Sequence, residues 1–469
     1  MRRLVLATVL LVACAASAGA APVLDPAKDT SEAFFGLTKV YTFQLTIAAA
    51  DFQRMPPPSG RGGRGRGGGA FAGADAGYPK VFARLQFDGK DWGTLTIRYK
   101  GNSSYGGAPS ELKRSLKLDF DAPDKSGTFF GMSKLNLNNN AFDPSQMREV
   151  LAYDVFHRAS VPAPRTAFAK VFITVPGLYM REYAGLFTVV EEIDQTFFKE
   201  RWGEKVGVLV KPEGLRGLPD LGDEWANYAS RYVSKVTAKL DEAARFIAFV
   251  KFVNQASDEE FARRIGEHLD VDEFLHFLAG EVVLVNTDSP LAMNHNYWVT
   301  IHPDTHKVIW VPWDMNMAFG GFGGGDADLS LHKPSAPGMF PLADRVLAIP
   351  ALVQRYDQIV REMTTANATI GRLNTQMQTV AAAIRAAVAA DTTTTMAAFE
   401  RNLVENPALV AGLAQGNGGG GRGRGGPPLR QFVANRVESV VAQLDGKRDG
   451  TPGRSRGFGG PGLGRGVQN

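Results

Sequence analysis

Two aspartates and one asparagine in the second half of the chain lie where apolar segments end, and together they could hold a divalent cation. Asp288 follows an apolar helical segment, Asn296 begins a predicted strand, and Asp314 follows the strand predicted at 307–311. Mg²⁺ prefers oxygen ligands and retains waters or phosphate oxygens as its remaining ligands. In kinases one aspartate orients the nucleophile, while an asparagine and a second aspartate hold the metal. The pattern therefore fits metal-assisted phosphoryl transfer, and it also fits carboxylates that only cap turns.

A basic hairpin in the first half of the chain could bind the phosphate groups of such a substrate. Alternation in 94–100 and 114–120 places Arg98, Lys100 and Lys117 on one face and apolar side chains, including Leu95, on the other. The intervening segment 101–107 is rich in glycine and serine, whose backbone N–H groups can contact phosphate oxygens. An ordinary solvated hairpin has the same pattern, so this feature alone leaves both interpretations open.

The net charge of +4 hides an acidic body. Basic segments at the N-terminus, at 59–70, at 422–424 and at 447–469 together carry +11, which leaves −7 for the rest of the 469-residue chain. A basic face for nucleic acid is therefore not expected on the body. The hydrophobic fraction of 44% is typical of a globular protein and excludes wholesale disorder.

Residues 1–20 have the features of an export signal, because Arg2 and Arg3 precede an apolar run and then small residues. The single cysteine, Cys14, ends a lipobox-like segment and could carry a lipid anchor, whereas ordinary cleavage before Ala21 would release a secreted form. No later apolar run approaches twenty residues, so no further membrane span is expected.

Apolar periodicity predicts an α+β fold, with a sheet-rich N-terminal part and a helical C-terminal part. Strands are predicted at 41–47, 80–87, 94–100, 114–120, 170–174, 185–190, 296–301 and 307–311. Helices are predicted at 145–159, 242–254, 271–285, 359–390 and 395–404. A cleft between the two parts is the expected position of the site.

Gly/Arg-rich composition marks the boundaries of this body. One domain is predicted over 32–411, with a flexible insert at 59–70 that interrupts a hairpin. Residues 412–469 are predicted to be mostly flexible, with one short helix.

The order of several motifs resembles the CotH kinase family of spore coat protein H. The motifs are RYKGNSS with KRSLKLDF, then LNLNNNAFDPSQMREVLAYDVFHRASVPAPRT, YAGLFTVVEEIDQTFF, GVLVKP, NTDSPLAMNHNYW and VPWDMNMAFG. They span about residues 41 to 320, roughly 60% of the chain. The resemblance implies an atypical, two-lobed protein-kinase-like fold and the ATP-dependent phosphorylation of Ser or Thr in a protein acceptor.

The resemblance also implies roles for individual residues. Asp288 matches the catalytic aspartate, while Asp314 and Asn296 match the residues that bind Mg²⁺ or Mn²⁺. Lys117 is the expected phosphate-contacting lysine, with Arg98 and Lys100 as competitors. On the helix at 145–159, Glu149 could pair with Lys117, although Arg148 is an equally suitable functional neighbour. Glu191 and Glu192 are expected to line the nucleotide pocket.

Two other functions remain open from the sequence. A surface-displayed binding protein could keep this fold with little catalysis, although it would not need Asp288, Asn296, Asp314 and Lys117 together. A glycoside hydrolase could use Asp288 and Asp314 as acid and base, but the basic hairpin would then have no role. The acceptor protein is not identified by any motif.

Overall fold

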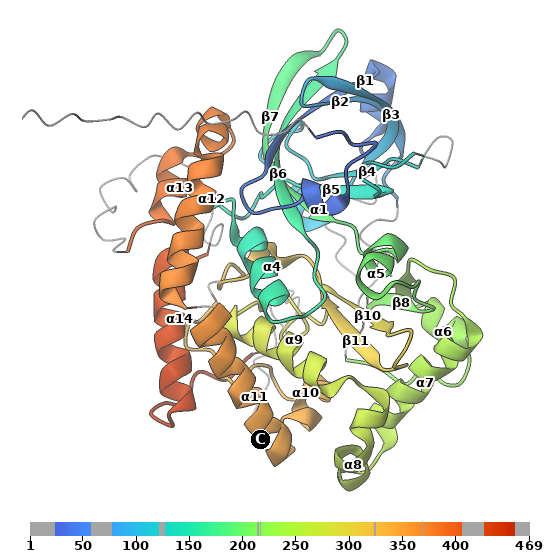
Figure 1. The fold of residues 1–469 in the computed structure, drawn as a ribbon, viewed down its shortest axis with the longest axis vertical. Helices are drawn as coiled ribbons and strands as arrows, with labels where there is room; N and C mark the ends of the chain where they lie inside the picture. Colours follow the sequence, from blue (N-terminus) through green and yellow to red (C-terminus); the bar gives the residue numbers. More distant parts are fainter. Residues whose placement is uncertain are drawn as a thin grey trace, which may run out of the picture.

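The computed structural model describes residues 24–57, 77–121, 127–212, 215, 217–322, 325–367, 369–405 and 426–454. Two hydrophobic cores run through these residues, one inside a β-barrel and one among the helices below it (Figure 1). The α+β class is confirmed, with strands concentrated in the first part of the chain and helices in the later part.

Seven strands of the first part close into a barrel in the order β1-β2-β3-β4-β5-β7-β6. Adjacent strands are antiparallel, except that β1 and β6 pair in parallel and complete the closure. The strands are β1 (Val40–Ile47), β2 (Val81–Phe87), β3 (Lys90–Tyr99), β4 (Leu116–Asp119), β5 (Lys134–Asn138), β6 (Thr166–Val175) and β7 (Tyr179–Glu191). The two-lobed prediction therefore needs a correction, because the sheet-rich part is a closed barrel. Closure pairs the strand edges that an open sheet would expose.

The alternation predicted for β3 and β4 is confirmed. Leu95, Ile97 and Tyr99 are buried inside the barrel, with exposed fractions of 0%, 1% and 4%. Arg98 and Lys117 lie on the outer face, as expected, and are cross-strand neighbours in the β3–β4 register. They are nevertheless only 8% and 7% exposed. This part of the barrel's outer face is therefore largely covered.

A second, four-stranded sheet lies in the helical part, in the order β11-β10-β8-β9. Its strands are β8 (Leu209–Pro212), β9 (Tyr232–Ser234), β10 (Tyr297–Ile301) and β11 (Val308–Pro312). The predicted hairpin of β10 and β11 is confirmed, with Tyr297 opposite Pro312 and Ile301 opposite Val308.

Helices surround this second sheet and support the barrel (Figure 1). The longer ones are α4 (Arg148–Arg158), α5 (Gln195–Trp202), α7 (Leu240–Gln255), α8 (Asp258–His268), α9 (Val271–Val283), α11 (Pro350–Glu362), α12 (Ile370–Ala390) and α14 (Leu429–Leu444). The short ones are α1 (Ser31–Phe34), α2 (Ala49–Arg54), α3 (Ser103–Gly106), α6 (Trp225–Ala229), α10 (Pro341–Val346) and α13 (Met396–Arg401). None of the helices in the described ranges is long and apolar enough to cross a membrane.

The C-terminal helices differ from the prediction in two places. The single helix expected at 359–390 is two helices, α11 and α12, separated by the π-helical turn Met363–Asn367. Beyond the boundary expected at residue 411, α14 is a full helix whose Phe432 and Val433 are 3% exposed and belong to the helical core. The folded body therefore extends beyond residue 411. The boundary itself, the insert at 59–70 and Cys14 lie outside the described residues.

Candidate active site

The β10–β11 hairpin brings Asn296 and Asp314 together. The residues that flank the paired strands stay in contact, since the Trp313 N–H donates to the carbonyl oxygen of Asn296 at 3.1 Å. Asn296 and Asp314 have positive φ angles of 61° and 57°. Asn and Asp enter this left-handed region more readily than most residues, and such conformations concentrate at functional sites.

Asp288 lies beside this hairpin, in the loop that follows α9. The Asn296 side-chain amide donates to the Asp288 carbonyl oxygen at 2.8 Å and to its Oδ2 at 3.3 Å. His295 Nε2 lies 2.8 Å from Asp288 Oδ1. Both carboxylate oxygens of Asp288 are thus oriented by neighbours, while 16% of its side chain remains exposed.

Asp314 is surrounded by charged groups that act on its carboxyl in opposite directions. Burial raises the pKa of Asp314, Lys100 lowers it, and the nearby carboxylate of Asp288 raises it again. Lys211 and His295 lower it further. Two carboxylates and several cations therefore converge on one partly buried site.

Glu149, on α4, is a fully buried neighbour of this cluster. Asn138 Nδ2, at the end of β5, donates to both of its carboxylate oxygens at 3.0 and 2.9 Å. Burial and the charge of Asp314 raise the pKa of Glu149 to about 8, so this side chain is largely protonated at neutral pH. Lys100 Nζ donates to Asn138 Oδ1 at 3.0 Å and lies over the ring of Trp313.

A second group of cations covers the outer face of β3, β4 and β5. Lys117 Nζ lies 2.6 Å from Glu192 Oε1, and Asn136 Nδ2 donates to Glu192 Oε2 at 2.7 Å. Lys235 Nζ lies 2.6 Å from Glu192 Oε1 and over the ring of Trp298. The structure thus pairs Lys117 with a glutamate other than Glu149, the partner that the resemblance suggested.

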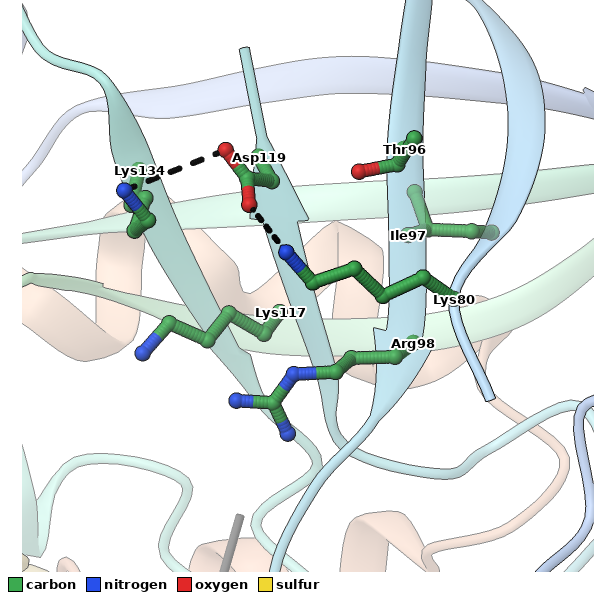
Figure 2. Close-up of a pocket in the computed structure, with 7 residues that line it drawn as sticks. All are labelled: Lys80, Thr96, Ile97, Arg98, Lys117, Asp119 and Lys134. Carbon is green, nitrogen blue, oxygen red and sulfur yellow. Dashed lines mark hydrogen bonds and ion pairs between the residues drawn. The ribbon is translucent and has the colours of Figure 1, made fainter. Parts of the chain in front are cut away.

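A small cavity of about 90 Å³ opens beside Lys117. Figure 2 shows Arg98 and Lys117 extending in the same direction from neighbouring strands, while Asp119 lies between Lys80 and Lys134. Thr96 and Ile97 complete its lining. Four cations line the cavity with one carboxylate, so it favours an anionic group.

Glu191, expected in the nucleotide pocket, is not part of this cation group in the structure. Its carboxylate lies between Arg165 and Arg201, with Arg201 NH2 donating to Glu191 Oε2 at 2.7 Å. Glu192 is the residue that contacts Lys117. Successive side chains of an extended chain point to opposite faces, so the two neighbouring glutamates serve different clusters.

The structure brings most of the expected residues together. The β10–β11 hairpin and the loop after α9 hold Asp288, Asn296 and Asp314, with Lys100 and Glu149 beside them. The neighbouring cavity is lined by Arg98 and Lys117. Sequence reasoning did not single out Asn136, Asn138, Lys211 or Lys235. The two asparagines had a visible signal, since both alternate with leucine in the segment LNLN of β5 and so share one face. Lys211 lies within the motif GVLVKP, whereas Lys235 lies in none of the motifs.

The donor set suits a divalent metal only with ligands from outside the protein. Among the described residues, no group of three or more His, Cys, Asp or Glu side chains could hold a metal ion. The carboxylate of Asp314 and the amide oxygen of Asn296, with Asp288 beside them, are fewer ligands than a protein cage provides. Mg²⁺ bound with a nucleotide takes its other ligands from phosphates and water, so these residues fit a metal–nucleotide complex.

Comparison with known proteins gives two matches. The family described as CotH kinase protein matches residues 97–408, about two thirds of the chain. "Inner spore coat protein H" of Bacillus subtilis (strain 168) is 25% identical over 211 residues, which cover 44% of this chain and 55% of the relative. The chain therefore spans about half the length of the curated relative. The family match begins in β3, ends after α13 and contains Asp288, Asn296 and Asp314.

Proposed function

Because the chain belongs to the CotH kinase protein family, we propose that it transfers the γ-phosphoryl group of ATP to a Ser or Thr hydroxyl of a protein acceptor. The observation that carries this proposal is the juxtaposition of Asp288, Asn296 and Asp314 beside two groups of cations. The barrel contributes Arg98 and Lys117 to these cations, while the helical part, with its second sheet, contributes Asp288, Asn296 and Asp314, and this arrangement supports the proposal.

In this proposal Asp288 orients the acceptor hydroxyl and takes its proton. Asn296 and His295 already fix the Asp288 carboxylate, so it needs little reorganisation before reaction. The acceptor oxygen forms a bond to the γ-phosphorus as the bond between that phosphorus and the bridging oxygen of ADP breaks. The hydroxyl proton moves to Asp288, and ADP leaves with the electron pair of the broken bond.

Asp314 and the amide oxygen of Asn296 would hold the metal. A bound Mg²⁺ or Mn²⁺ would neutralise charge on the phosphate oxygens. Asp314 must be ionised for this role. Burial raises its pKa, while Lys100 and Lys211 oppose that rise and favour the charged form, as a bound metal would. The acidic body makes such neutralisation necessary for a polyphosphate to approach.

The lysines and Arg98 would bind the phosphates. Lys117 and Arg98 are adjacent on the covered face of the barrel, and Lys100 extends toward Asp314. Glu192 holds Lys117 as the glutamate of a kinase Lys–Glu pair does. Glu149, which is buried and protonated, is then a structural neighbour of Lys100.

We also propose that the protein is exported and acts at or beyond the cell envelope, either free or anchored through Cys14. The export-signal pattern of residues 1–20 supports this, and the name of the Bacillus subtilis relative places that protein in a spore coat. The proposal does not specify which protein is the acceptor.

The test is incubation of the purified protein with γ-labelled ATP and Mg²⁺ or Mn²⁺, with and without casein as a generic acceptor. We expect label on Ser or Thr of the protein itself or of casein, and none with Asp288→Asn. Asp270→Asn, which changes an aspartate at the start of α9 outside the site, is the control and should retain transfer. ATP binding without transfer under either metal would instead support a binding protein with a kinase-like fold.

A further inference from the structure

We propose that Arg436, on α14, is a positioning residue for the candidate active site. Its guanidinium ties the end of α9, which leads into the Asp288 loop, to the chain that follows Asp314. The expected effect of Arg436 on catalysis rests on the proposed function. Its role in holding the two segments together rests on the geometry alone.

The guanidinium of Arg436 donates to backbone carbonyls of two separate segments. Arg436 NH2 donates to the Val282 oxygen at 2.9 Å, and Nε donates to the Val283 oxygen at 3.3 Å. From its other side, NH1 donates to the oxygens of Leu329 at 2.7 Å and of Ala327 at 3.0 Å. Arg436 is 2% exposed, so its own donors have little access to water and are committed to these carbonyls. The Val282 oxygen also accepts from the Val285 N–H at 3.1 Å.

The first segment is the C-terminal end of α9, immediately before the Asp288 loop. The last carbonyls of a helix lack intrahelical donors, and a cation there also interacts favourably with the helix dipole. Burial lowers the pKa of Arg436 to about 10, so the guanidinium remains charged at neutral pH. A lysine in its place would keep the charge but could not present donors in the same planar fork.

The second segment continues the chain from Asp314, and further contacts hold it against the first. The Phe319 N–H donates to the Leu284 oxygen at 2.6 Å. Arg148 NH1 donates to the oxygens of Ala318 and Phe319 at 3.2 and 2.8 Å. The loops of Asp288 and Asp314 are therefore joined directly, and Arg436 braces the chain on both sides of that junction.

The helix that carries Arg436 lies outside the range matched by the family. That match ends at residue 408, whereas Arg436 lies on α14. The segment leading into α14 adds a contact, because Arg148 NH2 donates to the Pro427 oxygen at 2.6 Å. Phe432 packs on Gly320, where φ is +69° and an added Cβ would lie 2.6 Å from the ring. Residues 426–444 thus complete a scaffold that the matched range does not contain.

The test compares Arg436→Lys with Val440→Ala in the full chain. Val440 is fully buried on the same helix and contributes packing without a side-chain polar group, so its truncation controls for loosening of α14. For Arg436→Lys we expect kcat to fall at least tenfold with the KM for ATP within about threefold, because the Asp288 and Asp314 loops lose their relative position. Val440→Ala should keep kcat within about twofold, measured well below both melting temperatures.

Hydrogen exchange gives a readout that does not require kinase activity. Arg436→Lys should accelerate exchange at the Val285, Asn286 and Phe319 amides at least tenfold, whereas Val440→Ala should leave them near the wild-type rate. Wild-type kcat together with wild-type exchange in Arg436→Lys overturns the inference. If the wild type transfers no phosphate, the proposed function fails, but the exchange comparison still decides the structural role of Arg436.

If Arg436→Lys does not fold, native-state exchange of the wild type in rising urea replaces it. We expect α14 and the three loop amides to open as one cooperative unit. Opening of α14 at lower urea, with the loop amides still protected, would overturn the inference.

Discussion

Lys117 Nζ lies 2.6 Å from Glu192 Oε1, which joins strand β4 to the residue that follows β7. Glu192 is 3% exposed and also accepts from Asn136 and Lys235. A buried carboxylate of this kind holds the lysine in one place on the covered face of the barrel. The ammonium is thus held in position by the protein itself.

Lys117→Met should weaken ATP binding at least tenfold, because it removes the positioned cation and leaves Glu192 with less compensation. Lys117→Arg should lose less affinity for ATP, since it keeps the positive charge. Calorimetric titration of each variant with Mg–ATP measures the difference in affinity. Lys90→Met, an exposed lysine at the start of β3, is the control and should bind like the wild type. Equal affinities for Lys117→Met and the wild type would remove Lys117 from the phosphate site.

Asp314→Asn and Asp288→Asn should fail in different ways. Asp314→Asn should abolish metal-dependent nucleotide binding, because the amide loses the charge that Mg²⁺ requires. Asp288→Asn should keep much of the Mg–ATP affinity and lose turnover by roughly 10²-fold or more, because it removes the proton acceptor. Binding and rate measured on both variants decide the assignment. The reverse pattern would exchange the two roles.

ATP should stabilise the protein only together with a divalent cation. The Asp288 and Asp314 carboxylates repel a bare polyphosphate, whereas a metal–ATP complex brings the neutralising charge with it. Thermal-shift titration with ATP plus Mg²⁺, and with ATP plus EDTA, measures this, since ligand stabilisation follows affinity. Stabilisation that is undiminished in EDTA contradicts the prediction, and Mg²⁺ alone is the control.

Glu281 should make stability depend on pH. It lies on α9 with an exposed fraction of 0%, and burial raises its pKa from the ordinary 4.5 to about 8. Between these values the folded chain binds a proton that the unfolded chain has released, so this contribution is complete below pH 4.5 and is lost as pH rises through about 8. Glu281→Gln mimics the neutral form. The melting temperature of Glu281→Gln should therefore rise relative to that of the wild type as pH increases from 5 to 9.

The matched control for Glu281 is Glu362→Gln, an exposed glutamate on α11. Because this side chain is exposed, the difference between the melting temperatures of Glu362→Gln and the wild type should change much less between pH 5 and 9. A Glu281→Gln curve parallel to the wild type would show that Glu281 ionises normally in the folded state.

Breaking the buried pair of Lys113 and Asp391 should cost more stability than breaking a pair on the surface. The pair joins the chain before β4 to the end of α12, and the two residues are 1% and 3% exposed. Asp391 Oδ2 also accepts from the Leu186 N–H at 2.9 Å. Asp391→Leu should lower the free energy of unfolding by about 3–5 kcal/mol, because it leaves the buried Lys113 without a countercharge and with only the Leu186 oxygen as an acceptor.

Urea denaturation measures this loss. Glu260→Gln, which removes one partner of the half-exposed Arg264 pair on α8, should cost less than about 1 kcal/mol. A similar loss for both variants would mean that breaking the buried pair costs no more than breaking a surface pair.

Local sequence pattern was enough to predict much of the secondary structure and to single out Asp288, Asn296 and Asp314, which the structure places close together. Period-two alternation located β1 to β4, and helical periodicity located α7 and α9, because burial of one face imposes those periods on any sequence. The motifs around Asp288, Asn296 and Asp314 indicated the family, and the family match confirmed it. These features depend on residues within a few positions of one another.

The partners of each charged side chain were decided only by the tertiary structure. Alternation places Lys117 on a face of β4 but does not reveal that Glu192, 75 residues later, faces it rather than Glu149. Barrel closure through parallel pairing of β1 and β6 has no local signature, because it depends on strands more than a hundred residues apart. Arg436 reaches Val282 from 154 positions away for the same reason. A local pattern fixes which face a residue occupies, whereas the packing of the whole chain fixes what that face meets.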